Sequence, residues 1–325
     1  MGCMKAIVIP AFGGPEALQL QEVPTPTPGP GEALVRMAAA GVNYRDVYER
    51  IGRYGGTPPL IAGAEGAGTV EAIGAGVTEV KSGDRVAFAS LPGSYAEYVA
   101  APAARLIPLP AALSMIEGAA FPLQGITAHY LVHEYYDVTP QTTVLVHAAA
   151  GGVGLLLVQM LKHLGARVIG TTSSEEKARL VRDAGADDVI LYTQADFVDE
   201  AKRLTGGNGV DLVLDGVGKT TLPGSLEAVR IRGTVVLYGS ASGRAEPIGP
   251  NSLQARSLTL AGGTLPNFIA TREELLRRAN DVLGAIASGN LDLRIDRTLP
   301  LEDAAEAHRL LESRATSGKL VLTVT

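Results

Sequence analysis

The segment 144–154, with the sequence VLVHAAAGGVG, constrains the fold more than any other part of the chain. Residues 144–146 predict a short buried strand, and the apolar run behind the glycines predicts a helix over about 152–164. Glycines in such a turn let the backbone approach a pyrophosphate, while the N–H groups of the helix start face its charge. The form is GxGxxG with Ala149 in the first position, so a bare helix turn after a buried strand remains the alternative. The candidate dinucleotide-binding residues of the turn are Gly151, Gly152, Val153 and Gly154.

Strands and helices alternate regularly after the glycine turn. Short apolar strands that alternate with helices form right-handed parallel crossovers and hence a doubly wound parallel α/β sheet. With 144–148 as the first strand and 257–260 as the last, six strands are available, as a full dinucleotide-binding sheet requires. We place this domain at 124–264. Between its first and last strands we predict strands 167–171, 188–192, 210–215 and 233–238 and helices 175–184, 196–204 and 221–229.

The N-terminal part, residues 1–110, instead shows short strands between Gly- and Pro-rich turns, which predicts a compact all-β unit of barrel type. The tail predicts a helix over 271–288, a strand near 294–299, a helix over 301–312 and a last strand over 319–324. Because a lone strand is not stable by itself, we expect the tail to return to the β unit. The substrate domain is therefore predicted to be discontinuous, at 1–123 and 265–325. Its N-terminal strands are predicted at 5–9, 18–23, 33–40, 68–73, 85–89 and 95–99, followed by helices at 114–120 and 124–135.

Composition excludes some classes of protein. The net charge is −6 without a run of Lys or Arg, which argues against nucleic acid or an anionic membrane as the main partner. The single cysteine, Cys3, excludes an intramolecular disulfide framework and a multi-cysteine metal site, and it fits a reducing, cytoplasmic location. The N-terminus shows no apolar segment behind a basic patch, so no secretory signal is expected.

Motifs spread over nearly the whole chain resemble the medium-chain dehydrogenase/reductases of the zinc-free quinone oxidoreductase type, the zeta-crystallin-like family. The resemblance implies a GroES-like β-barrel substrate domain, a Rossmann cofactor domain, NADPH, and a homodimer formed through the edges of the Rossmann sheets. The motifs that carry it are Gly13-Gly14-Pro15-Glu16, Gly41-Val42-Asn43 with Asp46, Ser82-Gly83-Asp84-Arg85-Val86, His147 to Gly154, Thr271-Arg272-Glu273-Glu274-Leu275 and Glu312-Ser313-Arg314-Ala315-Thr316.

The resemblance also implies the site residues. Asn43, Tyr48, Tyr54 and Gln124 are expected on loops that face the nicotinamide cleft, where a phenol can donate to a developing oxyanion or stack on a quinone ring. Packing at a domain edge explains the two tyrosines equally well. Cofactor contacts are expected from Asn43, Tyr44, Arg45, Asp46, Thr127, the glycine turn, Thr172, Ser173, Ser174, Lys177, Tyr192, Gly216, Val217, Tyr238, Gly239, Ser240, Thr264, Leu265 and Arg314.

No metal site is predicted. Asn43 and Ala64 stand where the zinc-bearing relatives carry a Cys and a His, and a catalytic zinc needs three protein donors. His129 and His133 are spaced to share a helix face, but with no third ligand nearby they are expected to be solvent or interface residues. His147 is expected to be a packed core histidine.

Without a Lewis acid, the acceptor must be electrophilic on its own, as a quinone or another conjugated carbonyl is. The expected activity is metal-independent, NADPH-dependent hydride transfer to such an acceptor in the inter-domain cleft. A reductase of enones or 2-enoyl thioesters and an NADPH-binding protein with little turnover are the alternatives.

The cofactor preference is predicted from the end of the second sheet strand. An NAD-selective site places Asp or Glu there to bind the ribose 2′-hydroxyl, whereas this chain continues with Thr172-Ser173-Ser174. Small hydroxyl side chains leave room for a 2′-phosphate, and Lys177 can reach back as a cation. The alternative is that Ser174 only caps the next helix, whose first residues Glu175 and Glu176 would repel a phosphate.

Overall fold

The structure is a computed structural model that describes residues 2–324. The chain divides into two compact units. The first comprises the residues up to Gln124, Ile269–Asn280 and the residues from Leu293 on, and the second comprises Gly125–Phe268 and Asp281–Asp292.

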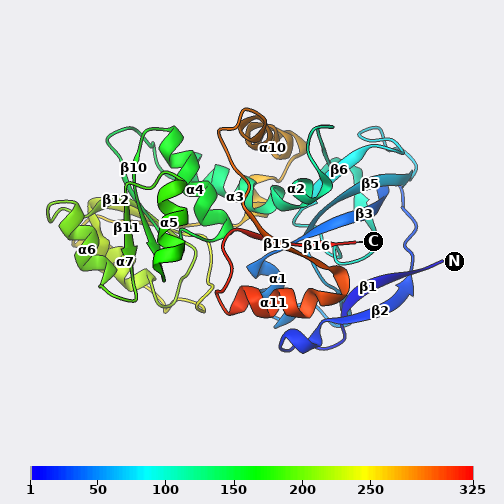
Figure 1. Cartoon of the computed structure of the whole chain (residues 1–325), viewed down its shortest axis with the longest axis horizontal. Coiled ribbons are helices and arrows are strands. Elements are labelled where there is room, and N and C mark those ends of the chain that lie inside the picture. Colours follow the sequence, from blue (N-terminus) through cyan, green and yellow to red (C-terminus); the bar gives the residue numbers. More distant parts are fainter. Residues whose placement is uncertain (1, 325) are drawn as a thin grey trace. The chain divides into compact units, whose positions relative to one another are not determined.

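The second unit is a parallel α/β sheet, as predicted. Its six strands lie in the order β11-β10-β9-β12-β13-β14, and every recorded pairing between neighbours is parallel. The strands are β9 (Thr143–Val146), β10 (Arg167–Thr172), β11 (Asp188–Leu191), β12 (Val210–Asp215), β13 (Val229–Leu237) and β14 (Thr259–Gly262). The helices are α3 (Pro122–His133, which starts in the first unit), α4 (Gly152–His163), α5 (Glu175–Asp183), α6 (Phe197–Leu204), α7 (Leu222–Ala228), α8 (Asn251–Gln254) and α9 (Leu265–Phe268). Figure 1 shows α4 to α7 gathered around strands β10 to β12.

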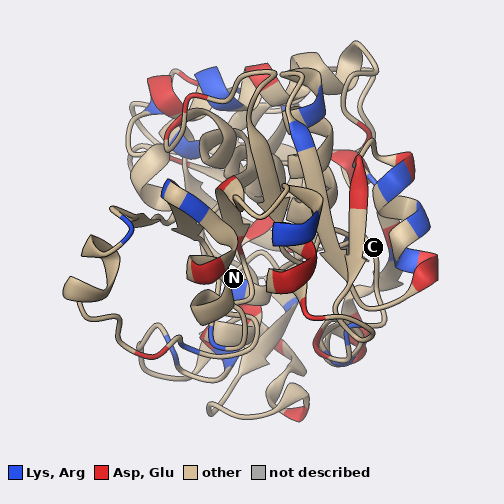
Figure 2. Ribbon diagram, turned by 90° about the vertical axis from the view of Figure 1, so that its left-hand side faces the viewer, with Lys and Arg blue, Asp and Glu red and all other residues tan. Residues whose placement is uncertain are grey.

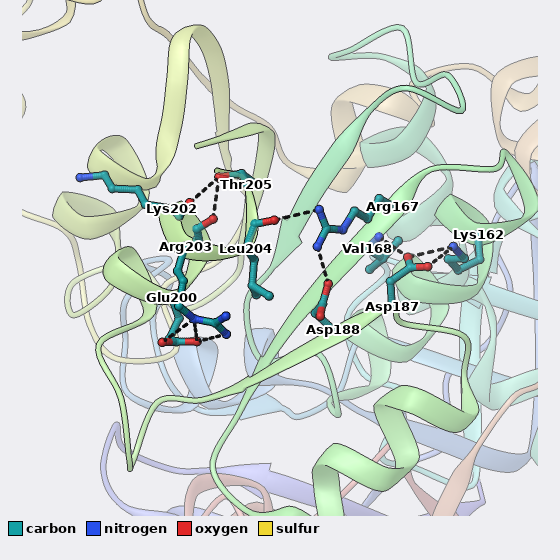
Figure 3. A network of polar contacts seen from close by, with 11 residues as sticks. Lys162, Arg167, Val168, Asp187, Asp188, Glu200, Lys202, Arg203, Leu204 and Thr205 are labelled. Atoms are coloured by element: carbon teal, nitrogen blue, oxygen red, sulfur yellow. Dashed lines mark hydrogen bonds and ion pairs between the residues drawn. The ribbon is translucent and has the colours of Figure 1, made fainter. Parts of the chain in front are cut away.

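The central strands of this sheet are apolar because helices cover both faces. Leu145, Ile169 and Val213 are fully buried and share one core with Leu222 of α7 and Ala201 of α6. A polar network ties the amino ends of β10 and β11 to the helices (Figure 3). In it, Arg167 binds Asp188 and the carbonyl of Leu204, and Lys162 binds Asp187. The network thus holds α4 and α6 to the sheet edge.

The first unit contains two sheets. The larger has seven strands, in the order β15-β16-β3-β5-β6-β8 with β7 paired to β3, and the smaller has the order β2-β1-β4. The strands are β1 (Cys3–Ile9), β2 (Gln19–Pro24), β3 (Glu32–Val42), β4 (Leu60–Ile61), β5 (Glu65–Ile73), β6 (Arg85–Ala89), β7 (Tyr98–Pro102), β8 (Ile107–Pro108), β15 (Ile295–Pro300) and β16 (Lys319–Thr323). The helices are α1 (Tyr44–Arg50), α2 (Met115–Ala120), α10 (Arg272–Ala287, which ends in the second unit) and α11 (Ala304–Glu312), with short 3-10 turns at Pro15–Ala17, Ala103–Arg105 and Leu301–Asp303.

The last strand of the tail lies in the larger sheet of the first unit. Strand β16 pairs antiparallel with β3, with Leu320 opposite Val42 and Leu322 opposite Ala40. These residues are buried in one core together with Ile7 of β1. The last strand is therefore an inner strand of the larger sheet.

The predicted domain assignment placed all of 265–325 with the β unit, whereas Asp281–Asp292 belongs to the second compact unit. Within that unit, Asp281 binds Nε2 of His129 on α3 at 3.1 Å, and Val282 packs against Gly125. These contacts explain why the end of α10 joins the second unit.

Three short helices, α1, α8 and α9, were missed, and α1 matters most for the site. Residues 44–50, expected as loop, form α1, and Tyr48 lies on it. Asn43 caps its start: the Asn43 N–H donates to Oδ2 of Asp46 at 2.8 Å, which is half of a capping box. Gln124 lies in the first turn of α3, as the predicted helix over 124–135 implies and contrary to its placement on a loop by the resemblance. Of the four residues expected on loops, two lie outside helices and strands: Asn43 directly precedes α1, and Tyr54 follows it.

Among the strand boundaries that differ from prediction, three have a clear local reason. The strand expected at 95–99 corresponds to β7, which starts only at Tyr98. Residues 95 and 96 instead contact β1, where the Ile7 N–H donates to the carbonyl of Tyr95. Strand β13 starts at Val229 rather than at residue 233. Its pairing with β12 shifts register after Val229, in a segment where Arg232 has φ 62°. Strand β14 starts at Thr259 because Ser257, at φ 52°, cannot continue a strand.

Acidic and basic residues are interspersed along the ribbon (Figure 2). This mixture fits the small net charge of −6. Among residues 2–324, the helices are too short or too polar to cross a bilayer.

Candidate functional site

The glycine turn connects β9 to α4 in the second unit. Ala148 has φ 49°, which reverses the chain, and its carbonyl accepts the Gly151 N–H at 2.8 Å. Gly151 is the N-cap residue of α4 and has no side chain to satisfy the first helical N–H groups. Those groups are therefore left to bind an anion, as a helix start can.

Gly154 is required by close packing. A Cβ at this position would lie 2.4 Å from the carbonyl oxygen of Ala148 and 2.7 Å from Cα of Ala149. At Gly151 the nearest such contact is 3.2 Å. The third glycine of the pattern therefore sets how closely α4 approaches the turn, the role expected of it in a dinucleotide fold.

The second strand, β10, ends in buried Thr171 and Thr172 and leads to Ser174, the N-cap residue of α5. The Ser174 hydroxyl accepts the Lys177 N–H at 3.3 Å, so the capping interpretation of Ser174 is correct. The cap uses an acceptor position of the Ser174 hydroxyl, and the hydroxyl hydrogen is not part of it. The capping contact is thus compatible with phosphate recognition.

Asp215 shapes the loop after β12. Its side chain is fully buried; Oδ1 accepts from the N–H groups of Val217 and Gly218 at 2.9 and 3.0 Å, and Oδ2 accepts from the Ser225 hydroxyl at 2.8 Å. Gly216 in this loop packs against the ring of Tyr238, which follows β13. The Asp215 carboxylate therefore fixes the loop without occupying its outer surface.

The predicted cofactor residues of the second unit follow the carboxyl ends of the sheet strands, which is where ligands bind in open α/β sheets. Gly216, Val217, Tyr238 and Gly239 lie together, since the Tyr238 N–H donates to the Asp215 carbonyl and Gly239 lies against the Gly216 carbonyl. The remaining predicted residues are Ser240 beside them, half-buried Lys177 on α5, Tyr192 after β11 with 42% of its surface exposed, Thr264 and Leu265 after β14, and Thr127 buried on α3.

His147 is a core residue, as predicted. It is 1% exposed, with Nδ1 3.0 Å from the Thr171 hydroxyl and Nε2 3.1 Å from the Ser225 hydroxyl. Burial lowers the pKa of His147, and the nearby Asp215 carboxylate partly opposes that effect. The imidazole therefore joins β9, β10 and α7 as a neutral group.

In the first unit, Asn43 belongs to a buried cluster that sequence reasoning missed. Lys319 donates from Nζ to Oδ1 of Asn43 at 2.7 Å and to Oε2 of Glu65 at 2.5 Å, and the side chains of Lys319 and Glu65 are 3% and 0% exposed. Oε1 of Glu65 accepts the Leu123 N–H at 2.6 Å. Gly41 admits this cluster, because a Cβ there would lie 2.4 Å from Oε2 of Glu65.

The cluster determines which way the Asn43 amide points. Its Oδ1 accepts from Lys319, and its Nδ2 donates to Oε2 of Glu65 at 2.8 Å and to the Gly41 carbonyl at 3.2 Å. Both Nδ2 hydrogens are therefore used inside the protein, since an amide nitrogen has two. In this arrangement Asn43 has no side-chain hydrogen left for an acceptor, and it acts as a brace between three segments of the first unit.

A second buried chain of hydrogen bonds ends at Asp46. Arg50 binds Glu312 with two bonds of 2.9 Å and donates to Nδ1 of His308 at 3.1 Å. Because arginine only donates, Nε2 of His308 carries the ring hydrogen and donates to the Tyr95 hydroxyl at 3.3 Å. That hydroxyl donates to Oδ2 of Asp46 at 3.1 Å.

This chain shifts the ionisation of its members. Burial raises the pKa of Asp46 to about 7, against the smaller effect of the Arg45 cation. Burial and the Arg50 cation lower the pKa of His308 to about 3. Asp46, 2% exposed and committed to Asn43 and Tyr95, thus holds α1 in place.

The predicted tyrosines lie together on and beside α1. The ring of Tyr48 is 6.1 Å from that of Tyr44 and 6.0 Å from that of Tyr54. The guanidinium of Arg53 lies 4.4 Å from the Tyr48 centroid, and that of Arg45 lies 5.7 Å from the Tyr54 centroid. Tyr48 is 9% exposed and Tyr54 is 58% exposed, so the group reaches from the core of the unit to its surface.

The other predicted first-unit residues lie near these clusters. Gln124 directly follows Leu123, whose N–H is held by Glu65. Arg314, with φ 59°, is close enough to Tyr44 to lower the pKa of that phenol, although burial raises it more.

The missed residues had weak signals in the sequence. Glu65 and Lys319 are single charges inside the apolar stretches 60–70 and 319–324, and Asp215 ends an apolar strand. A charge that is retained in a buried strand must be paired, but only the fold reveals its partner.

His129 and His133 share a helix face, with ring centroids 4.6 Å apart. The expectation that both are solvent or interface residues is wrong for His129, which is 6% exposed and binds Asp281. Within residues 2–324, no group of three His, Cys, Asp or Glu side chains is arranged to hold a metal ion.

Two family descriptions match the two units. "Alcohol dehydrogenase GroES-like domain" matches residues 29–111, and "Zinc-binding dehydrogenase" matches residues 152–281. The second description names zinc, yet Asn43 and Ala64 are not the Cys and His that would bind it.

Named relatives cover nearly the whole chain. Quinone oxidoreductase 1 of Escherichia coli is 41% identical over 317 residues (95% of this chain and 96% of that protein), and 2-haloacrylate reductase of a Burkholderia species is 40% identical over 326 residues (98% of each). The solved structure of a mycobacterial protein complexed with NADPH matches with a TM-score of 0.95 and 44% identity, covering 98% of this chain and 100% of that one. This chain belongs to the zinc-free quinone oxidoreductase family of the medium-chain dehydrogenase/reductases.

Proposed function

We propose that the protein is an NADPH-dependent oxidoreductase that transfers hydride, without a metal, to quinones or other conjugated carbonyl compounds. The observation that carries the proposal is the end-to-end similarity to relatives named quinone oxidoreductases. The residues support it, because Asn43 and Ala64 offer no Lewis-acid site and the acceptor must be electrophilic by itself.

NADPH is favoured over NADH by the end of β10. Thr172, Ser173 and Ser174 stand where an NAD-selective site has a carboxylate, and Lys177 lies one helical turn beyond. The mycobacterial relative was solved with NADPH. We assign the pyrophosphate to residues 151–154, the 2′-phosphate to Ser174 and Lys177, and the remaining cofactor contacts to the other predicted residues except Arg45. Of these, Asp46 is the least accessible.

Tyr48 and Tyr54 are proposed to contact the acceptor, with Gln124 beside them. Phenol hydroxyls can donate to the oxyanion that forms when hydride is added to a conjugated carbonyl. Burial raises the pKa of Tyr54, so its hydroxyl keeps its proton at neutral pH. Asn43, whose amide hydrogens are engaged, supports the site by holding α1 to β5 and β16.

Small conjugated acids and enones are a second class of acceptor. The relative named 2-haloacrylate reductase, at 40% identity over 98% of the chain, favours them. They share with quinones a carbon that accepts hydride because it is conjugated to a carbonyl group.

The test is NADPH oxidation with 1,4-benzoquinone, a small enone and a crotonyl thioester, before and after prolonged chelation. Activity with NADPH that survives chelation supports the proposal; one tightly bound zinc per chain contradicts it. NADPH binding without oxidation by any acceptor would instead support a binding protein.

The Lys177→Ala variant tests the cofactor assignment. A hydrogen bond to a charged group contributes about 1.5–3 kcal/mol, so NADPH should bind roughly ten- to a hundredfold more weakly while NADH binding is unchanged. Lys81→Ala, at an exposed residue of the first unit, is the control and should change neither affinity. Equal losses for both cofactors would show that Lys177 does not contact the 2′-phosphate.

We also propose that the protein is a cytoplasmic homodimer that pairs through the edge of the second-unit sheet. Strand β14 is the last strand of that sheet and is only partly covered. An uncovered strand edge is prone to association, and a second copy can satisfy it.

A further inference from the structure

Helix α1 carries an unusual concentration of unsatisfied polar atoms. Among residues 2–324, four buried side-chain nitrogen or oxygen atoms have no hydrogen-bond partner, and three of them belong to Arg45 (Nε), Asp46 (Oδ1) and Glu49 (Oε2). Buried polar atoms are nearly always satisfied, and an exception calls for a missing water or ligand. The three atoms lie within about one turn of one short helix.

Arg45 is placed among the residues assigned to the acceptor. Its guanidinium lies 5.7 Å from the centroid of Tyr54, whose ring is 6.0 Å from that of Tyr48. Tyr48 and Glu49 follow Arg45 by three and four positions, so all three side chains share one face of α1. A ligand that contacts the two tyrosine rings would therefore lie beside the Arg45 guanidinium.

The charge around these rings favours an anion. Arg45 and Arg53 each lie over a tyrosine ring, and Arg314 is near Tyr44. Asp46 and Glu49 interact with Arg45, and burial raises the pKa of each; Glu312 acts on Tyr44 together with Arg314. Burial thus favours the neutral form of the two acids that interact with Arg45, which leaves this cation able to pair with an anion.

We propose that Arg45 is a specificity-determining residue that binds a carboxylate on the acceptor, so that the preferred substrates are conjugated carbonyl compounds bearing a carboxylate. Guanidinium and carboxylate match as a bidentate pair, and such charge-assisted bonds are the stronger kind. The ligand would satisfy the Nε–H that is buried without a partner. This inference rests on the proposed reductase function and specifies its substrate class.

The test compares two acceptors that differ only in the carboxylate, 1,4-benzoquinone and 1,4-benzoquinone-2-carboxylate. The wild type should have the higher kcat/KM for the carboxylate. Arg45→Met should lower that kcat/KM by roughly ten- to a hundredfold and leave the neutral quinone unchanged, because only one acceptor loses a charge-assisted bond. Arg45→Lys should fall between, since lysine keeps the charge but not the planar pair of donors.

Two further measurements separate the possible failures. Binding of benzoate, which cannot be reduced, should weaken in Arg45→Met, while NADPH affinity should not change. The control is Arg36→Met, which removes an arginine that is 60% exposed from a surface ion pair with Glu71 of the same unit. Thermal unfolding of each variant shows whether it is folded. If Arg45→Met is unfolded, the comparison of the two quinones is made with Arg45→Lys instead.

The inference is overturned if Arg45→Met changes both quinones equally or neither, or if NADPH affinity is what falls. In the last case Arg45 binds the cofactor. If the wild type oxidises NADPH with neither quinone, the proposed function fails, and benzoate binding then decides the role of Arg45 by itself. Benzoate binding that does not depend on Arg45 would reject the inference.

Discussion

Lys319 and Glu65 form an ion pair that is almost completely removed from water, with side chains 3% and 0% exposed. Desolvating two charges costs several kcal/mol, and their attraction repays this only if the remaining hydrogen-bonding positions are satisfied. Here Asn43 and the Leu123 N–H supply those bonds. The pair therefore depends on all its members, and removal of one leaves an uncompensated buried charge.

Lys319→Met should lower the free energy of unfolding by about 3–5 kcal/mol, because it leaves the Glu65 carboxylate buried without its cation. Glu65→Gln combined with Lys319→Met should be less destabilised than the single variant. Urea denaturation measures both. As a control, Arg309→Met breaks the exposed pair with Glu306 and should cost about 1 kcal/mol or less. If Lys319→Met lowers the free energy of unfolding no more than Arg309→Met does, the buried ion pair does not stabilise the first unit.

Asp46 should make stability depend on pH. Burial raises its pKa from the ordinary value of 3.8 to about 7 in the folded protein, so the folded state holds the proton more tightly between these limits. The contribution of Asp46 to the free energy of unfolding is therefore complete below about pH 4. It decreases as the pH rises through 7, by up to about 1.4 kcal/mol per pH unit. Asp46→Asn mimics the protonated acid and should remove this loss.

The measurement is the difference in unfolding free energy between Asp46→Asn and the wild type at several pH values. The difference should be near zero at pH 4 and should favour the variant at pH 8. Comparison with the same chain cancels the opposite effect of His308, whose lowered pKa makes the protein less stable in acid. A difference that does not change with pH would show that Asp46 is ionised throughout.

At the residue scale, the sequence did not reveal which side chains Asn43 contacts. The resemblance pointed to Asn43 as a residue of the nicotinamide cleft, and the structure commits both of its Nδ2 hydrogens to Glu65 and Gly41. The partner Lys319 is 276 positions away in sequence. A pairing over that separation is set by the antiparallel register of β3 and β16, which no local pattern encodes.

At the scale of elements, the approach of α4 to the glycine turn depends on Gly154. Gly154→Ala would place a methyl group 2.4 Å from the Ala148 carbonyl oxygen, so the helix start must shift. We expect a loss of about 1–3 kcal/mol in stability, as for other overpacked sites, together with weaker NADPH binding. Gly151→Ala, with 3.2 Å at its nearest contact, should be the milder change. Denaturation and cofactor titration check the order, and equal effects would contradict it.

Elements of the second unit were predicted well because the sheet strands are continuous apolar runs between turn signals, as in β12. Helix α1 was missed because its sequence, YRDVYER, is polar and seven residues long. Its signal was the capping pair Asn43 and Asp46, three positions apart. Strands β4 and β8 have two residues each, too few to show a period.

At the scale of the molecule, the proposed dimer gives a prediction. Light scattering at micromolar concentration should give a mass twice the 33.7 kDa of one chain. Thr259→Asp places a charge on exposed edge strand β14 and should shift the protein toward monomer, since like charges would meet across a two-fold axis. Thr78→Asp, at an exposed residue of the first unit, should leave the mass unchanged. A monomeric wild type would contradict the prediction.

The architecture of the whole chain could be predicted because alternation of strands and helices specifies the parallel sheet. The division of the tail could not, because helix α10 has one continuous sequence although its residues join different units. Side-chain contacts such as that of Asp281 with His129 decide that division.

The position of β16 has a consequence for synthesis. The larger sheet of the first unit needs this strand beside β3, and Lys319 at its start completes the cluster around Glu65. Residues 319–323 leave the ribosome after every residue of the second unit, which ends at Asp292. The first unit, whose strands are made first, must therefore wait with residues 39–42 of β3 unpaired on that side, while the second unit can already close. During translation, the exposed edge of β3 is the part of this protein in greatest need of protection from aggregation.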